Sequence, residues 1–237
     1  MTRRRWIADE VSGNRAALVG SHAAHLAIVL RARVGQRFEV ASGGAIRSGQ
    51  ITSVSPERVE FELGEEIPAA AIPNITLLLA VFKFDRMEWA VEKCAELGVG
   101  RIIPVIARRT DLHLRRAADK RVERWRRLGQ QASEQSRRTA QVILDKPMRL
   151  QDVVPLTAPT RIVLAESERG VMLKDALQSH SPDEDLLLAV GPEGGWTEDE
   201  LNMFAQAGWT SASLGSTILR AETAAIAATA IAISELS

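Results

Sequence analysis

A glycine-rich turn directly after a short apolar run is the feature that most constrains the fold of this chain. Residues 186–190 read Leu-Leu-Leu-Ala-Val, which has the length and composition of a buried strand. The next five residues, Gly-Pro-Glu-Gly-Gly at 191–195, can neither continue that strand nor begin a helix. We expect a tight loop whose free backbone N–H groups a ligand can approach closely. Thr197 then begins a helix, with Glu200 placed for a capping box.

A second strand, loop and helix follow in the same order. Residues 209–214 form an apolar strand that ends in a Leu214–Gly215 turn, and an alanine-rich helix comes next. Arg220 and Glu222 lie where that helix begins. Two glycine-containing loops at strand ends, with a charged pair beside them, indicate a small-molecule site in an α/β fold.

Strands and helices also alternate through the middle of the chain. Apolar runs at 75–81, 102–106 and 161–165 predict further strands. Helical spacing at 86–97 predicts a helix that Gly98 ends, and a long helical stretch follows the strand at 102–106. Strands separated by helices imply a mainly parallel sheet with crossover helices.

The first 70 residues have a different pattern. Ser21 is expected to cap a short helix, and beyond it apolar and polar residues alternate at 37–40, 45–48, 50–54 and 58–63. Turn signals at Gly43–Gly44 and Ser55–Pro56 separate these runs, which predicts a small antiparallel β-barrel. A proline-bounded linker then divides a domain of residues 1–70 from a domain of residues 74–237.

Charge and cysteine content limit the possible functions. The formal net charge is zero, so any affinity for nucleic acid must come from a local patch. Cys94 is the only cysteine, which rules out an internal disulfide and fits a reducing compartment. No apolar run approaches the roughly 18 residues that span a bilayer. We therefore expect a cytoplasmic protein with no membrane partner.

A local basic patch is present between residues 115 and 138. Nine Lys or Arg stand there against Asp119, Glu123 and Glu134. The simple interpretation is a solvated helix face. The alternative is a surface that tracks phosphates, and the excess of arginine over lysine favours RNA. The nine are Arg115, Arg116, Lys120, Arg121, Arg124, Arg126, Arg127, Arg137 and Arg138.

Other kinds of site are poorly supported. No Lys-Ser/Thr pair follows the glycine-rich turn, so it is not a P-loop, and no GxGxxG follows a first strand. His22 and His25 share a helix face without a third ligand, so we expect no metal. Cys94 lies among apolar helical residues and is expected to be an inert core thiol.

Several segments together resemble a known family. Gly-Pro-Glu-Gly-Gly at 191–195, followed by Leu214–Gly215 and by Ile-Leu-Arg-Ala-Glu-Thr-Ala at 218–224, resembles the C-terminal signature of SPOUT-class RNA methyltransferases. Asp-Arg-Met-Glu at 85–88 and Glu-Gln-Ser at 134–136 make the chain more closely similar to the 16S ribosomal RNA uracil-N3 methyltransferases. That family modifies a uridine in the decoding region of the small subunit.

The resemblance implies a fold, a cofactor and partners. It implies an α/β protein with a C-terminal SPOUT trefoil-knot domain, a mainly parallel sheet and a small N-terminal PUA-like β-barrel that helps to hold RNA. It also implies a homodimer that binds S-adenosylmethionine and acts on 16S rRNA, within the small ribosomal subunit. The expected cofactor-binding residues are Leu164, Gly191, Pro192, Glu193, Gly194, Gly195, Leu214, Gly215, Ile218, Leu219, Thr223 and Ala224.

The resemblance also suggests roles in catalysis and RNA binding. Arg220 is the candidate cation that stabilises a developing uracil anion. Glu222 is expected to orient Arg220 or, as an alternative, to take up the N3 proton. The expected RNA-binding residues are Arg109, Arg124, Arg127, Ser136, Arg137 and Arg138.

Three residues depart from the family pattern. Thr217 stands where arginine is usual, Arg137 replaces a glycine, and Phe84 stands where glycine is common. Two alternatives therefore remain beside the leading hypothesis. One is a related SPOUT methyltransferase with another RNA target, and the other is a non-catalytic RNA-binding ribosome-assembly factor. A nucleotide-binding module is disfavoured because its phosphate motif is missing.

Overall fold

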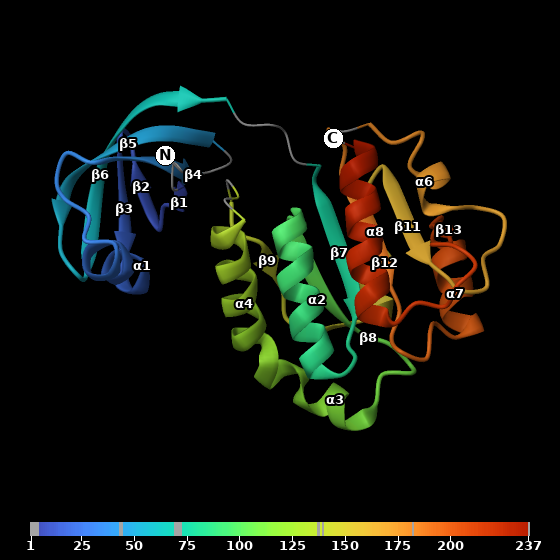
Figure 1. Cartoon of the computed structure of the whole chain (residues 1–237). Coiled ribbons are helices and arrows are strands. Elements are labelled where there is room, and N and C mark those ends of the chain that lie inside the picture. Colours follow the sequence, from blue (N-terminus) through green and yellow to red (C-terminus); the bar gives the residue numbers. More distant parts are fainter. Residues whose placement is uncertain are drawn as a thin grey trace. The chain divides into compact units, whose positions relative to one another are not determined.

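The computed structural model describes residues 5–42, 45–68, 73–136, 138, 140–181 and 183–236. They form two compact units (Figure 1): unit 1 comprises Met1–Ala70 and Ser133–Gln141, and unit 2 comprises Ala71–Ala132 and Val142–Ser237. Residues 133–141 are thus grouped with the N-terminal unit, whereas the sequence pattern placed them in the second domain. The predicted turn at Gly43–Gly44 and the predicted RNA contact Arg137 lie outside the described residues.

Unit 1 is a curled six-stranded sheet around its own small core. The strand order is β1-β4-β5-β6-β3-β2, and the pairing is antiparallel except between β1 and β4, which run parallel. Alternate residues of the strand at 58–67 point into the core, where Val59, Phe61 and Leu63 are buried. The strands are β1 (Arg5–Ile7), β2 (Glu10–Ser12), β3 (Arg15–Val19), β4 (Arg37–Ser42), β5 (Ala45–Val54) and β6 (Arg58–Ile67).

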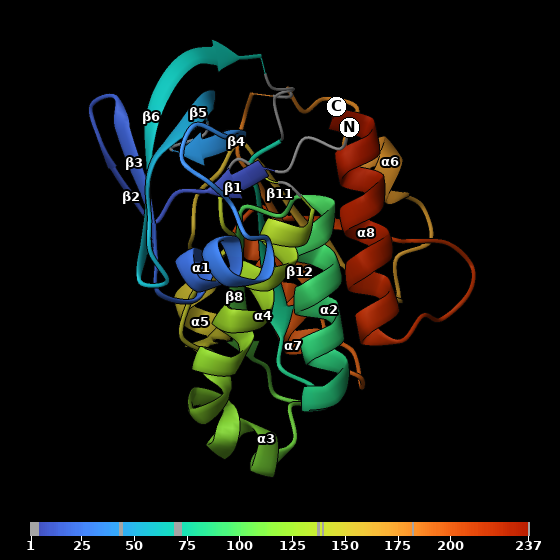
Figure 2. The ribbon, with the colours of Figure 1, turned by 60° about the vertical axis from the view of Figure 1, so that its left-hand side comes forward.

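The barrel-like part differs from its prediction in three details. The two strands expected at 45–48 and 50–54 are one strand, and register shifts toward β6 let the β5–β6 hairpin curve strongly (Figure 2). Gly49 is required in that strand because a Cβ there would lie 2.4 Å from a methyl carbon of Val40. The short strands β1 to β3 were not predicted. Helix α1 (Gly20–Ala24) has Val19 rather than Ser21 as its N-cap, and a π-helical turn, His25–Val29, follows it.

Unit 2 is built on one parallel sheet, as the alternating pattern predicted. The main strand order is β10-β8-β7-β12-β11-β13, with β9 beside β8, and every pairing among the described strands is parallel. Strand β12 therefore lies between β11, the strand before it in the chain, and β7, which is far from it in sequence. The strands are β7 (Ile75–Ala80), β8 (Arg101–Ile106), β9 (Ile143–Leu144), β10 (Met148–Arg149), β11 (Thr160–Leu164), β12 (Leu186–Val190) and β13 (Thr210–Ala212).

Helices cover both faces of this sheet, which explains why its strands are apolar on both sides. Leu77 and Leu79 face a core shared with α2, α4 and α8, while Leu78 and Ala80 face one shared with α5 and α7. Helices α2 and α8 lie side by side over the first face (Figure 1). The helices are α2 (Phe84–Leu97), α3 (Leu112–Ala117), a 3₁₀ turn (Ala118–Arg121), α4 (Val122–Gln135), α5 (Leu150–Val153), α6 (Leu173–Ala176), α7 (Glu198–Gln206) and α8 (Ala221–Leu236).

Small residues let α8 pack closely against α2. Ala225, Ala228 and Ala232 are fully buried on the inner face of α8. Cys94 of α2 lies in the same layer, where the Thr229 hydroxyl lies 3.5 Å from its sulfur. Burial raises the pKa of the Cys94 thiol to about 12, so the thiol is inert as expected. None of the described helices combines the length and apolar character that crossing a bilayer requires.

Candidate functional site

A pocket in unit 2 lies where three parallel strands end. The segments that follow β11, β12 and β13 line it together, because the carboxyl ends of parallel strands meet at one edge of the sheet. Its cavity volume is about 240 Å³, slightly below the roughly 300–1,000 Å³ of small-molecule sites. The lining includes Leu164, Glu166, Ser167, Arg169, Val190, the residues 191–196, the residues 212–215, the residues 217–219, Ala221 and Ala224.

The first loop, residues 191–195, is held in a single tight conformation. Gly195 has a φ of +68°, which L side chains adopt only with strain. A Cβ at Gly191 would come within 3.2 Å of the Trp196 indole, which packs beneath the loop. The predicted capping box is confirmed: Thr197 Oγ1 accepts from the Glu200 N–H at 3.3 Å, and Glu200 accepts from the Thr197 N–H at 2.8 Å.

Arg109 also lines the pocket and holds this loop through its side chain. Its Nη1 donates to the carbonyl of Gly194 at 2.5 Å and to that of Trp196 at 3.3 Å. The arginine side chain also lies against Gly194, where a Cβ would meet its Cδ at 3.3 Å. The sequence analysis expected Arg109 to bind RNA. In the structure its guanidinium donates to two carbonyls of the loop region, and a contact between Arg109 and RNA stays a prediction.

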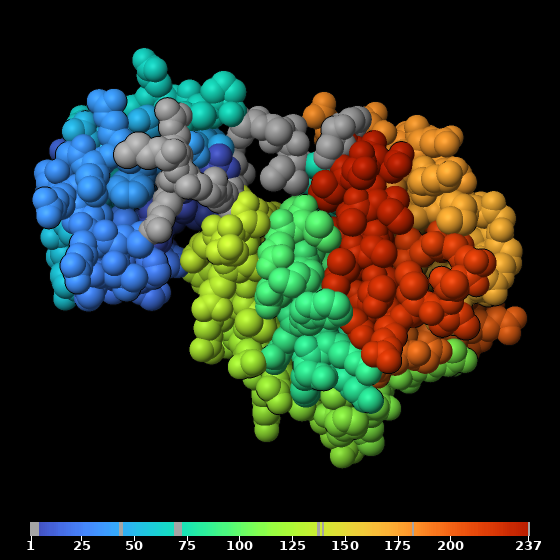
Figure 3. Space-filling view, in the orientation of Figure 1, coloured from blue at the N-terminus to red at the C-terminus, as the bar shows by residue number. Residues whose placement is uncertain are grey.

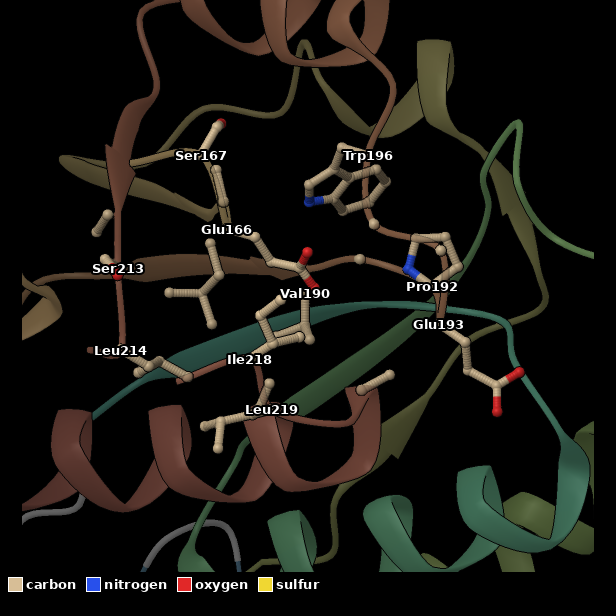
Figure 4. A pocket seen from close by; sticks show the side chains of 18 of the residues that line it. Glu166, Ser167, Val190, Pro192, Glu193, Trp196, Ser213, Leu214, Ile218 and Leu219 are labelled. Atoms are coloured by element: carbon tan, nitrogen blue, oxygen red, sulfur yellow. The ribbon is translucent and has the colours of Figure 1, made fainter. Parts of the chain in front are cut away.

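The second loop, residues 213–219, is held much less firmly. The Gly215 N–H donates to Ser213 Oγ, and that hydroxyl donates to the Gly215 carbonyl, both at 3.2 Å. Residues 216–219 make no backbone hydrogen bond to the rest of the described chain. Ile218 is apolar and yet 77% exposed, and Figure 4 shows it beside Val190 inside the pocket. The second loop therefore presents exposed apolar surface to the pocket.

Glu166 is a pocket residue that the sequence analysis missed. Figure 4 shows its carboxylate directed toward the middle of the pocket, between Trp196 and Ile218. Within the described part of the chain it has no hydrogen-bond or ion-pair partner. A carboxylate there favours a ligand that carries positive charge or donates hydrogen bonds. A signal was available, because an acidic residue directly follows the predicted strand at 161–165.

Arg86 links the first loop to the start of α8, and this role was not predicted. It lies in the first turn of α2, where its Nη1 is 2.9 Å from Glu193 Oε1 and its Nε is 3.6 Å from Glu222 Oε1. Glu222 is buried at the start of α8, so its ion-pair partner is Arg86 and not Arg220. Arg220 is exposed, and its side chain makes no hydrogen bond or ion pair with another described residue. The described contacts of Glu222 are therefore with Arg86, and the orientation of Arg220 by Glu222 stays a prediction.

Most of the predicted cofactor-binding residues are brought together. All of them line the pocket except Thr223. Thr223 is exposed and instead lines a separate shallow hollow with Trp89, Ile226 and Ala227, on the outer side of α2 and α8. The side chain of Glu193 points away from the pocket (Figure 4), so only its backbone belongs to the lining.

The predicted RNA-binding residues lie in different surroundings. Arg124 pairs with Glu88 at 2.6 Å, whereas Arg127 is exposed and has no side-chain partner among the described residues.

Ser136 and Arg138 belong to unit 1, where Arg138 is only 8% exposed and burial lowers its pKa to about 10. Within unit 1, His22 contacts carboxylates at 3.0 Å and 2.7 Å, and its pKa rises to about 9, chiefly through the hydrogen bond to Glu134. The His22 ring is therefore engaged in ion pairs. Among the described residues, no three His, Cys, Asp or Glu side chains are grouped so that they could hold a metal ion.

Comparisons with known proteins agree with this architecture. The model of the RNA methyltransferase domain family matches residues 70–233. The chain is 32% identical to the ribosomal RNA small subunit methyltransferase E of Rickettsia conorii, over 88% of this chain and 85% of that protein.

Two solved structures resemble the whole chain. One is a ribosomal RNA small subunit methyltransferase E from Neisseria gonorrhoeae bound to S-adenosyl methionine, with 29% identity and a TM-score of 0.79 over 96% of this chain and 95% of that one. The other is a putative methyltransferase from Legionella pneumophila in complex with the same cofactor, with 25% identity and a TM-score of 0.80 over 99% and 98% of the two chains. The parallel sheet with its pocket of strand-end loops, the matching domain model and the similarity along nearly the full length lead to one conclusion: the chain belongs to the ribosomal RNA small subunit methyltransferase E family of RNA methyltransferases.

Proposed function

We propose that this protein uses S-adenosylmethionine to methylate N3 of a specific uridine in the decoding region of 16S rRNA. The observation that carries the proposal is the pocket formed by the segments after β11, β12 and β13. Its glycine-rich backbone, its apolar side chains and the unpaired Glu166 carboxylate fit a ligand with a flat base, hydroxyl groups and cationic centres. When bound, S-adenosylmethionine supplies an activated methyl group on a sulfonium.

The pocket residues divide the work of holding this cofactor. Leu164, Leu214 and Leu219 offer apolar surface for the base, and the backbone of residues 191–195 offers hydrogen-bonding groups. The Glu166 carboxylate faces the cationic part of the ligand or its hydroxyl groups. Because the residues 191–195 are held by Arg109 and Arg86 before binding, they position the cofactor, and positioning supplies much of the rate acceleration.

Arg220 is the proposed catalytic residue. Uracil N3 becomes a nucleophile only as it loses its proton, which passes to water and leaves negative charge on the ring. When N3 takes up the methyl group, that charge is neutralised and the sulfonium becomes a neutral thioether. The guanidinium of Arg220 is exposed, unpaired among the described residues, and directly follows the pocket residue Leu219. It is therefore available to stabilise that charge. Glu222 is 5% exposed and paired with Arg86, so we assign it to the support of the α8 start that follows Arg220 rather than to proton uptake.

The substrate is proposed to be RNA because unit 2 carries unpaired basic side chains. Within the described chain, Arg121, Arg124 and Arg126 have acidic partners, whereas four other basic residues of the patch are exposed without one. Unpaired arginines and lysines are the groups that bind phosphates. The four are Arg115, Arg116, Lys120 and Arg127.

A homodimer in the cytoplasm completes the proposal. The hollow on α2 and α8 is mainly apolar, with Trp89 49% exposed, and Figure 3 shows the two helices side by side at the surface. A second copy of the chain is the proposed occupant of this face. Light scattering should give twice the chain mass, and Trp89→Ser should weaken the association.

The direct test is transfer of a tritiated methyl group. Small subunits and naked 16S rRNA from cells that lack the modification are incubated with the protein and labelled S-adenosylmethionine. Label should map to N3 of one uridine. Arg220→Ala should lower kcat by about 10²–10³-fold with cofactor affinity retained, while Arg101→Ala, which breaks an exposed ion pair with Asp145, should have no effect. A folded protein that binds the cofactor but labels neither RNA would contradict the 16S target.

A related methyltransferase with another RNA target is the second candidate. Thr217, which replaces the arginine usual in the family, lines the pocket and is exposed. The departure therefore falls where cofactor and substrate meet. Labelling of total RNA from the same cells would reveal such a target if the small subunit stays unlabelled.

A further inference from the structure

A single arginine of helix α2 lies beside both the first loop of the pocket and the start of α8. Arg86 forms an ion pair with Glu193, which belongs to the first loop, and lies within ion-pair distance of Glu222, which begins α8 after the second loop. The side chains of Arg86 and Glu193 are each about one third exposed, at 30% and 31%. Three segments that are far apart in the sequence thus meet at one guanidinium.

The contact with Glu193 acts on the pocket through the backbone. The Glu193 carboxylate points away from the pocket, while the backbone on either side of it forms the wall (Figure 4). Glycines at 191, 194 and 195 give this segment more conformational freedom than other residues would. A side-chain anchor in the middle of the loop reduces that freedom. Glu193 is therefore a tether rather than a ligand group.

The contact with Glu222 concerns a buried charge. Glu222 is 4% exposed, and its Oε2 has no hydrogen-bond partner among the described residues. Arg86 is its only cationic neighbour within 4 Å in that part of the chain. The N-terminus of α8 also favours a carboxylate. Removing Arg86 would still leave a buried carboxylate without a counter-charge, which is strongly unfavourable.

We propose that Arg86 is a positioning residue that fixes the first loop relative to the start of α8 and thereby sets the width of the cofactor pocket. The proposal rests on the proposed function, because the pocket is taken to hold S-adenosylmethionine. Arg86 does not line the pocket, so it acts through Glu193 and Glu222 and not by touching the ligand.

The test compares Arg86→Met, Arg86→Lys, Glu193→Gln and Arg86→Met/Glu193→Gln in the full chain, with Arg101→Met as the matched control. Arg101, at the start of β8, pairs with Asp145, which directly follows β9, at 2.6 Å. For Arg86→Met we expect the calorimetric Kd and the KM for S-adenosylmethionine to rise about tenfold, with kcat changed less than about threefold. Glu193→Gln should act in the same direction, and the double variant should be no worse than Arg86→Met, because both changes break one contact.

Arg86→Lys keeps the charge but loses the fork, so it should recover part of the affinity. Unchanged Kd and KM in Arg86→Met would overturn the proposal, as would additive effects in the double variant. Arg86→Met/Glu222→Gln separates positioning from simple charge neutralisation. It should regain melting temperature but not cofactor affinity, whereas full recovery of both would show that Arg86 only neutralises Glu222.

Hydrogen exchange without cofactor keeps this test independent of the proposed function. Arg86→Met should speed amide exchange at residues 193–195, and Arg101→Met should not. Unchanged exchange there would refute the tether. A wild-type protein that fails to bind S-adenosylmethionine would contradict the proposed function alone.

Discussion

The two loops that line the pocket differ in how firmly the rest of unit 2 holds them. The first, at 191–195, is fixed by Arg109 from one side, by Arg86 through Glu193 from another, and by the packed ring of Trp196. In the second, residues 216–219 make no backbone hydrogen bond within the described chain. The first loop is ordered before the ligand binds, whereas the second loop has backbone hydrogen-bonding groups without partners in the described chain.

This difference shows which of the two loops needs to be ordered before the ligand binds. Backbone groups that recognise a small ligand gain affinity when they are ordered in advance, because no ordering entropy is lost on binding. A loop that leads to Arg220, the proposed catalytic residue, must also accommodate the proposed RNA substrate. The exposed Ile218 is consistent with a wall that completes itself around the ligand.

The largest expected effect comes from releasing the firm loop. Arg109→Leu removes two charge-assisted hydrogen bonds to the loop carbonyls, so the Kd for S-adenosylmethionine should rise about thirtyfold or more. Arg108→Leu is the matched control, because the side chain of Arg108 forms an ion pair with the exposed Asp199 and not with the loop. Calorimetry measures both. If Arg109 serves RNA binding instead, the Kd for cofactor will stay unchanged and the KM for RNA will rise.

A smaller effect is expected from straining the same loop at Gly195. Its φ of +68° costs an L side chain about 1–2 kcal/mol, so Gly195→Ala should weaken cofactor binding about fivefold to thirtyfold. Gly195→Asn should be milder, because asparagine tolerates the left-handed region. Equal losses in the two variants would mean that space, and not backbone strain, is limiting there.

The loose loop should respond to a change that leaves stability untouched. Ile218→Ser removes apolar surface that is exposed in the free protein and covered only by ligand, so the Kd should rise about fivefold, equivalent to about 1 kcal/mol. The melting temperature should not change. Met203→Ser, at another exposed apolar position on α7, should alter neither quantity. A fall in melting temperature for Ile218→Ser would show that the second loop is already packed.

The subtlest test needs no substitution. Amide exchange at residues 216–219 should slow when S-adenosylmethionine is added, because these N–H groups lack protein partners beforehand. Amide exchange at residues 193–195 should slow less. A larger slowing at 193–195 than at 216–219 would show that the first loop, and not the second, becomes ordered when the cofactor binds.

Sequence reasoning located the pocket but not the contacts that brace it. The apolar run at 186–190, the glycines after it and the Thr197 capping box are local signals, and all three are present as predicted. Arg86 and Glu193 are 107 residues apart, so no local pattern could pair them. Arg220 and Glu222 were linked because they are neighbours in sequence. The fold gives Glu222 to Arg86 instead, because α2 lies beside α8. Strands β1 to β3 were missed because they are short and carry little apolar periodicity.

The position of β12 in the middle of the parallel sheet has a consequence for synthesis on the ribosome. Ile75 of β7 pairs with Leu186, a residue made 111 positions later. At about 5–20 residues per second, the apolar edge of β7 waits roughly 6–22 s before its partner strand is made. Nascent chains of this protein therefore carry an open strand edge through nearly half of their translation. A pause or truncation before residue 186 should yield aggregation-prone fragments that bind chaperones.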